Sequence, residues 1–315
     1  MLEGICVRTS SSFRVEGIEV SQSLDGRVAV VTGAGAGLGR AEAIGLARDG
    51  ATVIVNDLQS ALDSSDVFDE IAGVGGKAVP VAGDIADSAT AAEIMRVATQ
   101  DLGGLHVVMN NAGITRDAML FNMTDEQWDL VQRVHLRGHF LLNRNAAAHW
   151  RAESKASGAP VYGRLINTSS EAALLGGAGQ ANYSAAKAGI SMLTVSASRA
   201  LARYGATANA ICPRARTAMT ADVFGAAPED AVDPLSPEHV VTLVRYLAGP
   251  SAQNVSGQVF VVYGPKVSLM AAPKVQEVFA ADGDQWSPEA LGDVVSAYFA
   301  EPEKVGTFSA SDLMD

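Results

Sequence analysis

The chain has 315 residues, of which 48% are hydrophobic and 18% are charged, and its formal net charge is −12. This composition is typical of a globular protein with a large core and excludes a disordered chain. The negative charge argues against a nucleic acid or an anionic membrane surface as a partner, because binding to phosphates needs a basic face. Local cations can still bind a phosphate-bearing cofactor.

Cysteine usage and hydropathy indicate where the protein works. The two cysteines, Cys6 and Cys212, form no CxxC pair, so they predict neither a zinc site nor a disulfide framework, which fits a reducing compartment. The N-terminus has no uninterrupted apolar run that could serve as a signal peptide. Nor does the chain contain the roughly 18 consecutive apolar residues that a membrane span needs. We therefore expect a cytoplasmic protein.

From residue 27 onward, short β-branched runs alternate with longer segments of helical periodicity. Apolar runs of this kind, separated by helices, predict a parallel sheet that is covered on both faces. With right-handed crossovers this is a doubly wound, Rossmann-like α/β fold with a seven-stranded, mainly parallel sheet. The expected strands are 27–32, 51–57, 77–84, 105–110, 163–169, 207–212 and 258–264. The expected helices are 37–49, 60–73, 88–102, 124–151, 183–204 and 236–248.

Three parts are expected along the chain: an N-terminal extension (1–24), one Rossmann domain (25–265) and a C-terminal extension (266–315). Segment 152–162 is interpreted as a long surface loop between a helix and the next strand. In the C-terminal extension, Ser-Pro-Glu at 287–289 predicts a helix that continues to about residue 300. Serine is a favoured helix cap, and proline is favoured at the first helical position.

The first predicted strand leads into a glycine-rich segment, Thr-Gly-Ala-Gly-Ala-Gly-Leu-Gly at 32–39, which is followed by a helix. Glycines at this point permit a tight turn and let backbone N–H groups approach a pyrophosphate at the helix N-terminus. The spacing is TGxxxGxG and not the common GxGxxG. The residues expected to bind a dinucleotide here are Gly33, Ala36, Gly37, Leu38 and Gly39.

Asp57 ends the second predicted strand, the next strand after the glycine-rich segment. A carboxylate at this place can accept hydrogen bonds from the hydroxyls of an adenosine ribose, and it would repel a 2′-phosphate. Asp57 therefore favours NAD as the cofactor over NADP, although an aspartate at a strand end can also be an ordinary turn residue.

Tyr183 and Lys187 are separated by one helical turn at the start of a predicted helix, so they share one face. A free tyrosine has a pKa near 10, and only about one in a thousand is ionised at pH 7. An ammonium group beside it favours the tyrosinate, and Ser170, upstream of Tyr183, can bond a substrate oxygen. Asn-Asn-Ala-Gly at 110–113 and Asn-Thr-Ser-Ser at 167–170 follow strands, at the edge where open α/β sheets bind ligands.

The combination of TGxxxGxG, NNAG, a serine at the spacing of Ser170 from Tyr183, and YxxxK closely resembles the short-chain dehydrogenase/reductase family over about residues 26–264. The resemblance implies that Tyr183 transfers the hydroxyl proton, and that Ser170 orients the carbonyl. It implies that Lys187 lowers the pKa of Tyr183 and binds the nicotinamide ribose. The further cofactor contacts that it implies are Asp84, Ile85, Asn111, Ala112, Gly113 and Thr217.

Two positions depart from the family pattern. His135 stands where the family usually has an asparagine, which is thought to act through its backbone carbonyl and a water that reaches the lysine; His135 is therefore retained as a candidate catalytic residue. Pro213-Arg214 replaces the usual Pro-Gly. Arg214 and Arg216 either pair with phosphates of coenzyme A or are solvated loop charges. His135 and His139 have the spacing of a helical metal pair, but position 136 is not glutamate and no third ligand is identifiable, so we expect no metal.

Several stretches, among them NNAGITRD and RVHLRGHF, resemble bacterial 3-oxoacyl reductases and the hydroxyacyl-CoA dehydrogenase unit of peroxisomal multifunctional enzymes. His135, the loop at 213–225 and the C-terminal extension are most similar to bacterial 17β-hydroxysteroid and (3R)-hydroxyacyl-CoA dehydrogenases of sterol side-chain degradation. This implies NAD-dependent oxidation of an acyl-CoA or steroid alcohol by a homodimer or homotetramer. A stretch with Met119, Phe121 and Met123 either suits a bulky substrate or belongs to the core.

Two other functions compete with this one. The first is an NADPH-dependent 3-oxoacyl-ACP reductase, although such reductases usually carry a basic residue where this chain has Ala36. The second is a non-catalytic dinucleotide-binding protein, against which the complete set of Ser170, Tyr183 and Lys187 argues.

Overall fold

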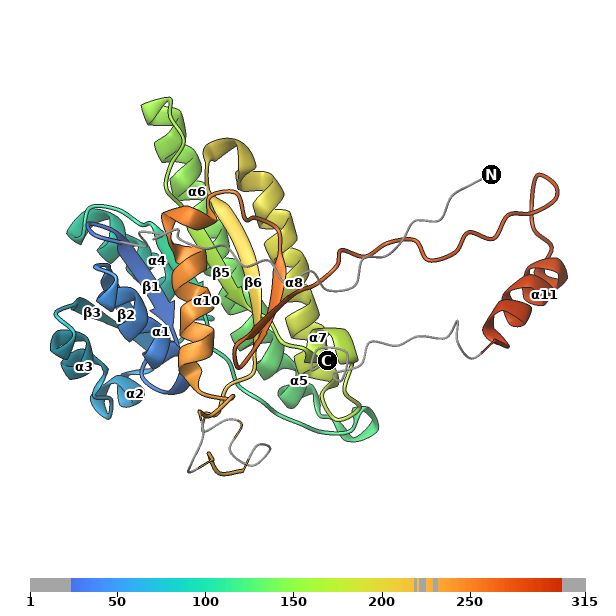
Figure 1. Ribbon diagram of the computed structural model, residues 1–315, viewed down its shortest axis with the longest axis horizontal. Helices are drawn as coiled ribbons and strands as arrows, with labels where there is room; N and C mark the ends of the chain where they lie inside the picture. Colours follow the sequence, from blue (N-terminus) through green and yellow to red (C-terminus); the bar gives the residue numbers. More distant parts are fainter. Residues whose placement is uncertain (1–23, 218–219, 221–224, 229–231, 302–315) are drawn as a thin grey trace.

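The computed structural model describes residues 24–217, 220, 225–228 and 232–301. The predicted N-terminal extension therefore lies outside the described residues, apart from Leu24. One sheet of eight strands forms the centre, in the order β3-β2-β1-β4-β5-β6-β7-β8. All neighbouring strands pair in parallel except β7 and β8, which are antiparallel. Helices cover both faces of the sheet (Figure 1).

The strands are β1 (Val28–Thr32), β2 (Thr52–Asp57), β3 (Lys77–Ala82), β4 (Val107–Asn110), β5 (Arg164–Thr168), β6 (Thr207–Pro213), β7 (Val259–Tyr263) and β8 (Lys266–Leu269). The α-helices are α1 (Gly37–Arg48), α2 (Gln59–Asp63), α3 (Val67–Gly73), α4 (Ser88–Arg96), α5 (Asp125–Gln132), α6 (Gly138–Ser157), α7 (Ala172–Leu175), α8 (Ala181–Leu201), α10 (Pro237–Ala248) and α11 (Pro288–Phe299). A wide, π-helical turn at Arg133–Arg137 joins α5 to α6.

The central strands are buried on both faces, which is why their sequences are continuous apolar runs. Every residue of β1, β4 and β5 is buried. One core cluster, with Leu46 and Val244, packs α1 and α10 against the sheet, and a second, with Ile94 and Leu141, packs α4 and α6 against the other face. The resulting three layers bring the carboxyl ends of the parallel strands to one edge of the sheet, where an open α/β fold binds its ligand.

The sheet has one strand more than the predicted seven. β8 lies in the segment that was predicted to be a C-terminal extension, and it pairs with β7 through a hairpin in which Tyr263 is opposite Lys266. Gly264 forms this turn with a φ of 53°, a conformation that glycine adopts without a steric penalty. We expected the strand at 258–264 to be the last one, and the structure shows that Gly264 and Pro265 form the turn of a hairpin.

The predicted surface loop at 152–162 is also too long. Helix α6 continues to Ser157 and ends at Gly158, whose φ is 70°. Residues 152–157 include good helix formers and contain no proline or glycine, so nothing stops the helix before Gly158.

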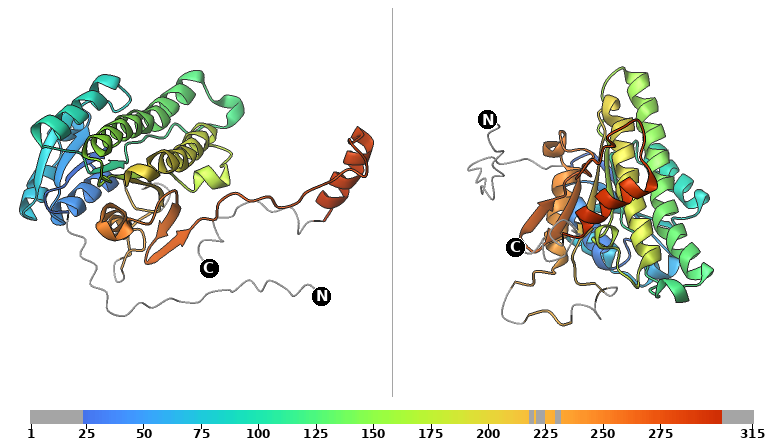
Figure 2. Two further views of the ribbon diagram at one scale, coloured as in Figure 1. Left: turned by 90° about the horizontal axis from the view of Figure 1, so that it is seen from above. Right: turned by 90° about the vertical axis from the view of Figure 1, so that its right-hand side faces the viewer.

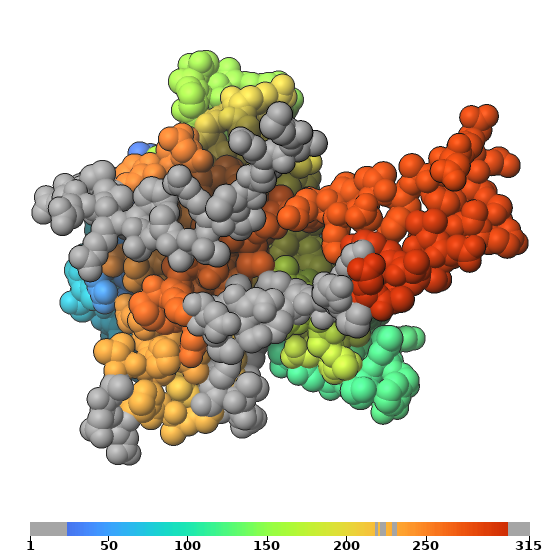
Figure 3. Space-filling view, turned by 45° about the vertical axis from the view of Figure 1, so that its right-hand side comes forward, coloured from blue at the N-terminus to red at the C-terminus, as the bar shows by residue number. Residues whose placement is uncertain are grey.

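The helix predicted after Ser287 is confirmed. The Ser287 side chain accepts a hydrogen bond from the N–H group of Ala290, and Pro288 is the first helical residue. Figures 2 and 3 show that α11 stands apart from the domain at the end of an extended segment, and none of its residues is buried. Among the described helices, none is both long and apolar enough to cross a membrane.

Candidate active site

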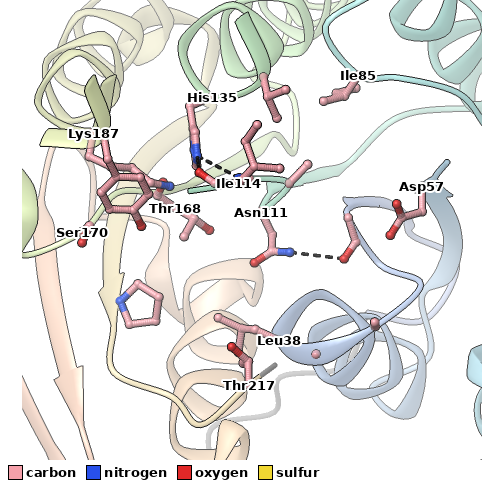
Figure 4. A pocket seen from close by; sticks show the side chains of 18 of the residues that line it. Leu38, Asp57, Ile85, Asn111, Ile114, His135, Thr168, Ser170, Lys187 and Thr217 are labelled. Carbon is pink, nitrogen blue, oxygen red and sulfur yellow. Dashed lines mark hydrogen bonds between the residues drawn. The ribbon is translucent and has the colours of Figure 1, made fainter. Parts of the chain in front are cut away.

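A cavity of about 550 Å³ opens at the carboxyl edge of the parallel strands (Figure 4). It brings together residues from the loops that follow β1, β2, β3, β4, β5 and β6. The predicted site residues that line it are Ser170, Tyr183, Lys187, His135, Gly33, Ala36, Gly37, Leu38, Asp57, Asp84, Ile85, Asn111, Ala112, Gly113 and Thr217. Gly39 is the one predicted site residue that does not line the cavity.

Gly39 instead allows the glycine-rich loop to pack against the loop after β4. A Cβ atom on Gly39 would lie 2.3 Å from the carbonyl oxygen of Gly33 and 2.5 Å from Nδ2 of Asn111. Thr32 joins the same two loops, because its Oγ1 accepts hydrogen bonds from the N–H groups of Asn111 (3.0 Å) and Ala112 (3.1 Å). The glycine-rich loop therefore packs backbone against backbone on the loop after β4.

The Asp57 carboxylate faces the glycine-rich loop. Its Oδ2 accepts a hydrogen bond from the N–H group of Gly35 (2.9 Å), and its Oδ1 accepts one from Leu58 (2.8 Å). Each carboxylate oxygen can accept a further hydrogen bond, so Asp57 can still receive ribose hydroxyls. This part of the cavity fits a dinucleotide of the NAD(P) class. It combines a glycine-rich loop, the N-terminus of α1 and a carboxylate at the end of the next strand.

Asp84 lines the cavity, but its carboxylate is already paired. Arg133 donates to Asp84 Oδ2 (2.6 Å) and to Asp87 (2.7 Å), and this connects the loop after β3 to the wide turn before α6. Ile85 is buried against the position where Gly138 would carry a side chain. The expectation that these two residues contact the cofactor stays a prediction.

Ser170, Tyr183 and Lys187 converge at one end of the cavity. Lys187 is 2% exposed, donates through Nζ to the carbonyl oxygen of Thr168 (2.7 Å) and lies 5.4 Å from the centre of the Tyr183 ring. Burial lowers the pKa of Lys187 to about 7. This placement follows from the sequence, because α8 begins at Ala181 and presents both side chains on one face toward the end of β5.

Two opposing effects act on the Tyr183 phenol. Burial raises its pKa, and the hydrogen bond with Ser170 acts in the opposite direction. The Lys187 ammonium group donates to the Thr168 carbonyl. The expectation that Lys187 also lowers the pKa of Tyr183 stays a prediction.

His135 is 1% exposed, and its ring packs edge-to-face on the Tyr183 ring with 5.2 Å between the ring centres. Its Nε2 faces the backbone of Ile114 (Figure 4). His139 directs its Nδ1 at the carbonyl oxygen of His135 (2.8 Å). One nitrogen of each ring is thus directed at backbone.

Neither alternative for the two loop arginines describes what the structure shows. Arg214 forms a two-pronged ion pair with Glu171 (2.6 and 2.9 Å), and both side chains are 14% exposed. Arg216 pairs with Asp233 (3.0 Å). The two guanidinium groups are largely buried and hold the cavity wall through carboxylates of the chain itself.

The sequence did not identify the residues that contact Lys187 and His135 through backbone atoms. The carbonyl of Thr168 holds Lys187, and both backbone groups of Ile114 face His135. No residue-type pattern identifies such positions, because any side chain is compatible with them. The sequence analysis also did not identify Glu171 as the partner of Arg214, although Glu171 directly follows the candidate Ser170.

The family model described as short chain dehydrogenase matches residues 27–226. The chain belongs to the short-chain dehydrogenase/reductase family. It is therefore an oxidoreductase that acts on CH–OH groups, with a nucleotide of the NAD(P) class and a small-molecule substrate.

Relatives and solved structures agree with this assignment. The chain is 64% identical over 299 residues to hydroxyacyl-CoA dehydrogenase ChsB1 of Mycobacterium tuberculosis, which covers 92% of this chain and 94% of that protein. It is 42% identical over 244 residues to peroxisomal multifunctional enzyme type 2 of Mus musculus, which covers 74% of this chain and 31% of that longer protein. The crystal structure of a short chain dehydrogenase from Mycobacterium avium is similar at a TM-score of 0.78 and 44% identity, over 88% of this chain and 96% of that one.

Proposed function

We propose that this protein is an NAD-dependent dehydrogenase that oxidises the β-hydroxyl group of a hydroxyacyl-CoA thioester to a ketone. The observation that carries the proposal is that Ser170, Tyr183 and Lys187 converge in the cavity that the glycine-rich loop and Asp57 also line. The identity with a hydroxyacyl-CoA dehydrogenase over nearly the whole chain supports the substrate class.

In the proposed reaction a bound nicotinamide would supply the hydride acceptor for the carbinol carbon. Ser170 donates a hydrogen bond to the substrate oxygen and holds it beside the Tyr183 hydroxyl. Tyr183 Oη takes the hydroxyl proton, so that the proton and the hydride leave the substrate to different acceptors. Lys187, which is fixed at Thr168, is placed to bind the nicotinamide ribose and to favour the ionised tyrosine during turnover.

The same residues favour NAD over NADP. A 2′-phosphate would place nearly two negative charges beside the Asp57 carboxylate. Arg40 is the cation nearest to this end of the loop in sequence, but it donates to both carboxylate oxygens of Glu70 (2.7 and 2.6 Å). Ala36 occupies the position at which NADPH-dependent reductases usually carry a base, so the loop itself supplies no cation for a phosphate.

The apolar segment after the NNAG loop is an argument for a substrate with a bulky, hydrophobic acyl group. Met119 is 44% exposed and Phe121 is 80% exposed, so these two residues do not belong to the core, which was the alternative interpretation. Their segment follows Arg116, which lines the cavity. A sterol-derived thioester or a free steroid alcohol is the second substrate class that this surface favours. A homodimer or homotetramer stays our expectation from the family resemblance.

Tyr183→Phe tests the mechanism. The variant keeps the packed ring and removes the only proposed proton acceptor, so we expect turnover to fall at least about 100-fold, the lower range for a general base, while NAD⁺ binding stays near wild type. Calorimetry measures the binding and steady-state kinetics measure the turnover. Retention of more than about a tenth of the activity would show that another group takes the proton.

A substrate panel with NAD⁺ tests the proposed substrate. The panel compares hydroxyacyl-CoA thioesters, sterol-derived CoA esters, free 17β-hydroxysteroids and thioesters on acyl carrier protein. We expect the highest kcat/KM for a CoA thioester. Equal activity on carrier-protein and CoA thioesters, together with a preference for NADPH, would favour the biosynthetic reductase. Nucleotide binding without turnover of any substrate would favour the non-catalytic alternative.

A further inference from the structure

Three polar side chains lie in line on the helix that packs behind the active site. His135 lies in the wide turn Arg133–Arg137, and His139 and Asn143 follow it at four-residue steps in α6, so the three share one face. They are 1%, 2% and 4% exposed. Burying polar groups costs free energy unless they are hydrogen-bonded, so the contacts of this histidine ladder (His135, His139 and Asn143) show what it holds in place.

His139 is the middle member of the ladder, and it is hydrogen-bonded to the backbone of His135. Its Nδ1 lies 2.8 Å from the carbonyl oxygen of His135, which can only accept, so Nδ1 carries the hydrogen and donates it. Burial lowers the pKa of His139 to about 3, and the nearby Lys187 ammonium acts in the same direction. The ring is therefore neutral and fixed in one tautomer.

His135 carries this constraint to the reacting groups. Its Nε2 lies 2.7 Å from the carbonyl oxygen of Ile114 and 3.0 Å from the Ile114 nitrogen. Its Cε1 lies 2.3 Å from the position that a Cβ atom on Gly113 would take, so the ring rests directly on the backbone of the NNAG loop. The other contact of the ring is the edge-to-face packing on Tyr183.

Asn143 fixes the far end of the ladder. Its Oδ1 accepts a hydrogen bond from Nδ2 of Asn110 (2.8 Å), which also donates to Asn167 (2.9 Å). Asn110 is the last residue of β4. The ladder therefore connects the end of β4 to the loop that follows it, and His139 lies between the two attachments.

We propose that His139 is a positioning residue. Through the backbone of His135 it holds the His135 ring against Gly113, Ile114 and Tyr183, and so keeps the nicotinamide end of the cavity in the form that binds the nucleotide. This proposal rests on the proposed function, because the nucleotide is the ligand whose binding it explains. A side chain that only filled space would act through its volume. In our proposal nucleotide binding depends instead on the N–H group at Nδ1 of His139 and not on the volume of the ring.

The test compares His139→Leu, which keeps a buried side chain and removes the donor, with His139→Asn, which returns an amide N–H near the position of Nδ1. His149→Leu is the matched control, because this histidine lies on the same helix and faces Glu153 at 3.5 Å. The measurements are NAD⁺ affinity by calorimetry, thermal unfolding, and kcat and KM. We expect His139→Leu to weaken NAD⁺ binding about tenfold, as the loss of one buried hydrogen bond predicts. His139→Asn should recover affinity to within about threefold of wild type, and His149→Leu should leave it unchanged.

A double-mutant cycle provides an independent measurement. If His139 acts through His135, then His135→Leu and His139→Leu weaken NAD⁺ binding by amounts that do not add in the double variant. Additive effects would overturn the proposal, and so would a His139→Leu variant with a lower melting temperature and unchanged NAD⁺ affinity. Should His139→Leu fail to fold, His139→Asn and His139→Ala compare a side chain that has a donor with one that has none, and equal NAD⁺ affinity in these two would overturn the proposal. Failure of the proposed function is distinguishable, because it appears as absent turnover in the wild type while NAD⁺ binding still reports on His139.

Discussion

At the scale of a single residue, Asp57 is the side chain that we propose distinguishes NAD from NADP. Like charges about 4 Å apart cost about 1 kcal/mol in water-like surroundings and about 4 kcal/mol at an effective dielectric constant of 20. The loss of a hydrogen bond to a charged acceptor adds about 1.5 to 3 kcal/mol. Even the lower sum exceeds the free energy of about 1.4 kcal/mol that corresponds to a tenfold preference.

We therefore expect wild-type protein to prefer NAD⁺ at least about tenfold in kcat/KM, and Asp57→Ala to lose most of this preference. Kinetics with both nucleotides at constant ionic strength measure the ratio. The variant also removes the acceptor for the Gly35 N–H group (2.9 Å), so Asp57→Asn serves as a control that keeps a side-chain oxygen. An unchanged ratio in both variants would show that Asp57 does not discriminate.

Lys187 makes the stability of the protein depend on pH. Its pKa falls from 10.5 to about 7 because it is buried, so between these values the folded protein releases a proton that the unfolded chain keeps. A lowered pKa weakens the folded state most below pH 7, and the penalty disappears as pH rises through 10.5. The full difference corresponds to an upper limit of roughly 5 kcal/mol.

Lys187→Met should therefore unfold at a higher denaturant concentration than wild type at pH 7, although we expect it to be inactive. The gain should shrink by about 1.4 kcal/mol for each pH unit between pH 7.5 and 9.5. Urea unfolding at several pH values measures it, with Lys155→Met, at an exposed position, as the control. A variant that is less stable than wild type at pH 7 would show that the bond to Thr168 outweighs the cost of burial.

At the scale of elements, the site depends on how closely two loops approach each other. Gly39 is the second residue after the Gly37 that starts α1, and it has no room for a methyl group between Gly33 and Asn111. Gly73, the last residue of α3, has nothing within 4 Å of the place where its Cβ would stand. The two glycines thus form a matched pair of helical positions, one crowded and one open.

Gly39→Ala should push the glycine-rich loop away from the loop after β4 and weaken nucleotide binding at least about tenfold, at a stability cost of about 1 to 3 kcal/mol for overpacking. Gly73→Ala should keep full affinity and gain a few tenths to about 1 kcal/mol from helix propensity. Calorimetry and thermal unfolding of both variants separate the two effects. Equal nucleotide affinity in the two variants would mean that the loops adjust freely.

At the scale of the whole molecule, the packed domain ends later than predicted. β8 completes the sheet through Leu269, whereas α11 has no buried residue and stands away from the sheet (Figure 1). Removal of residues 271–315 should therefore leave the melting temperature within about 2 °C of wild type, since none of the residues that the structure describes in this segment is buried. Removal of residues 265–315 also takes away β8, so it should lower the melting temperature clearly. Equal melting temperatures for both truncations would show that β8 contributes nothing.

The sequence alone determined the fold class, and it identified most of the side chains that the structure brings together in one cavity. Fully buried parallel strands need continuous apolar runs, and this requirement made β1, β4 and β5 visible. The glycine-rich segment, Asp57, Ser170, Tyr183 and Lys187 were equally visible, because each chemical task needs a particular side chain at a particular spacing. The resemblance that they carry was confirmed by the match over residues 27–226.

Only the tertiary structure decided which groups meet. The hydrogen bond that lowers the pKa of Tyr183 comes from Ser170, the Lys187 ammonium is bound to a backbone carbonyl, and Arg214 is held by Glu171. The turn at Gly264 continues the sheet into β8, although Gly-Pro ends many strands. The physical reason is the same in each case. Sequence spacing determines the face of an element on which a side chain lies, whereas the packing of the elements determines which group of another element it meets.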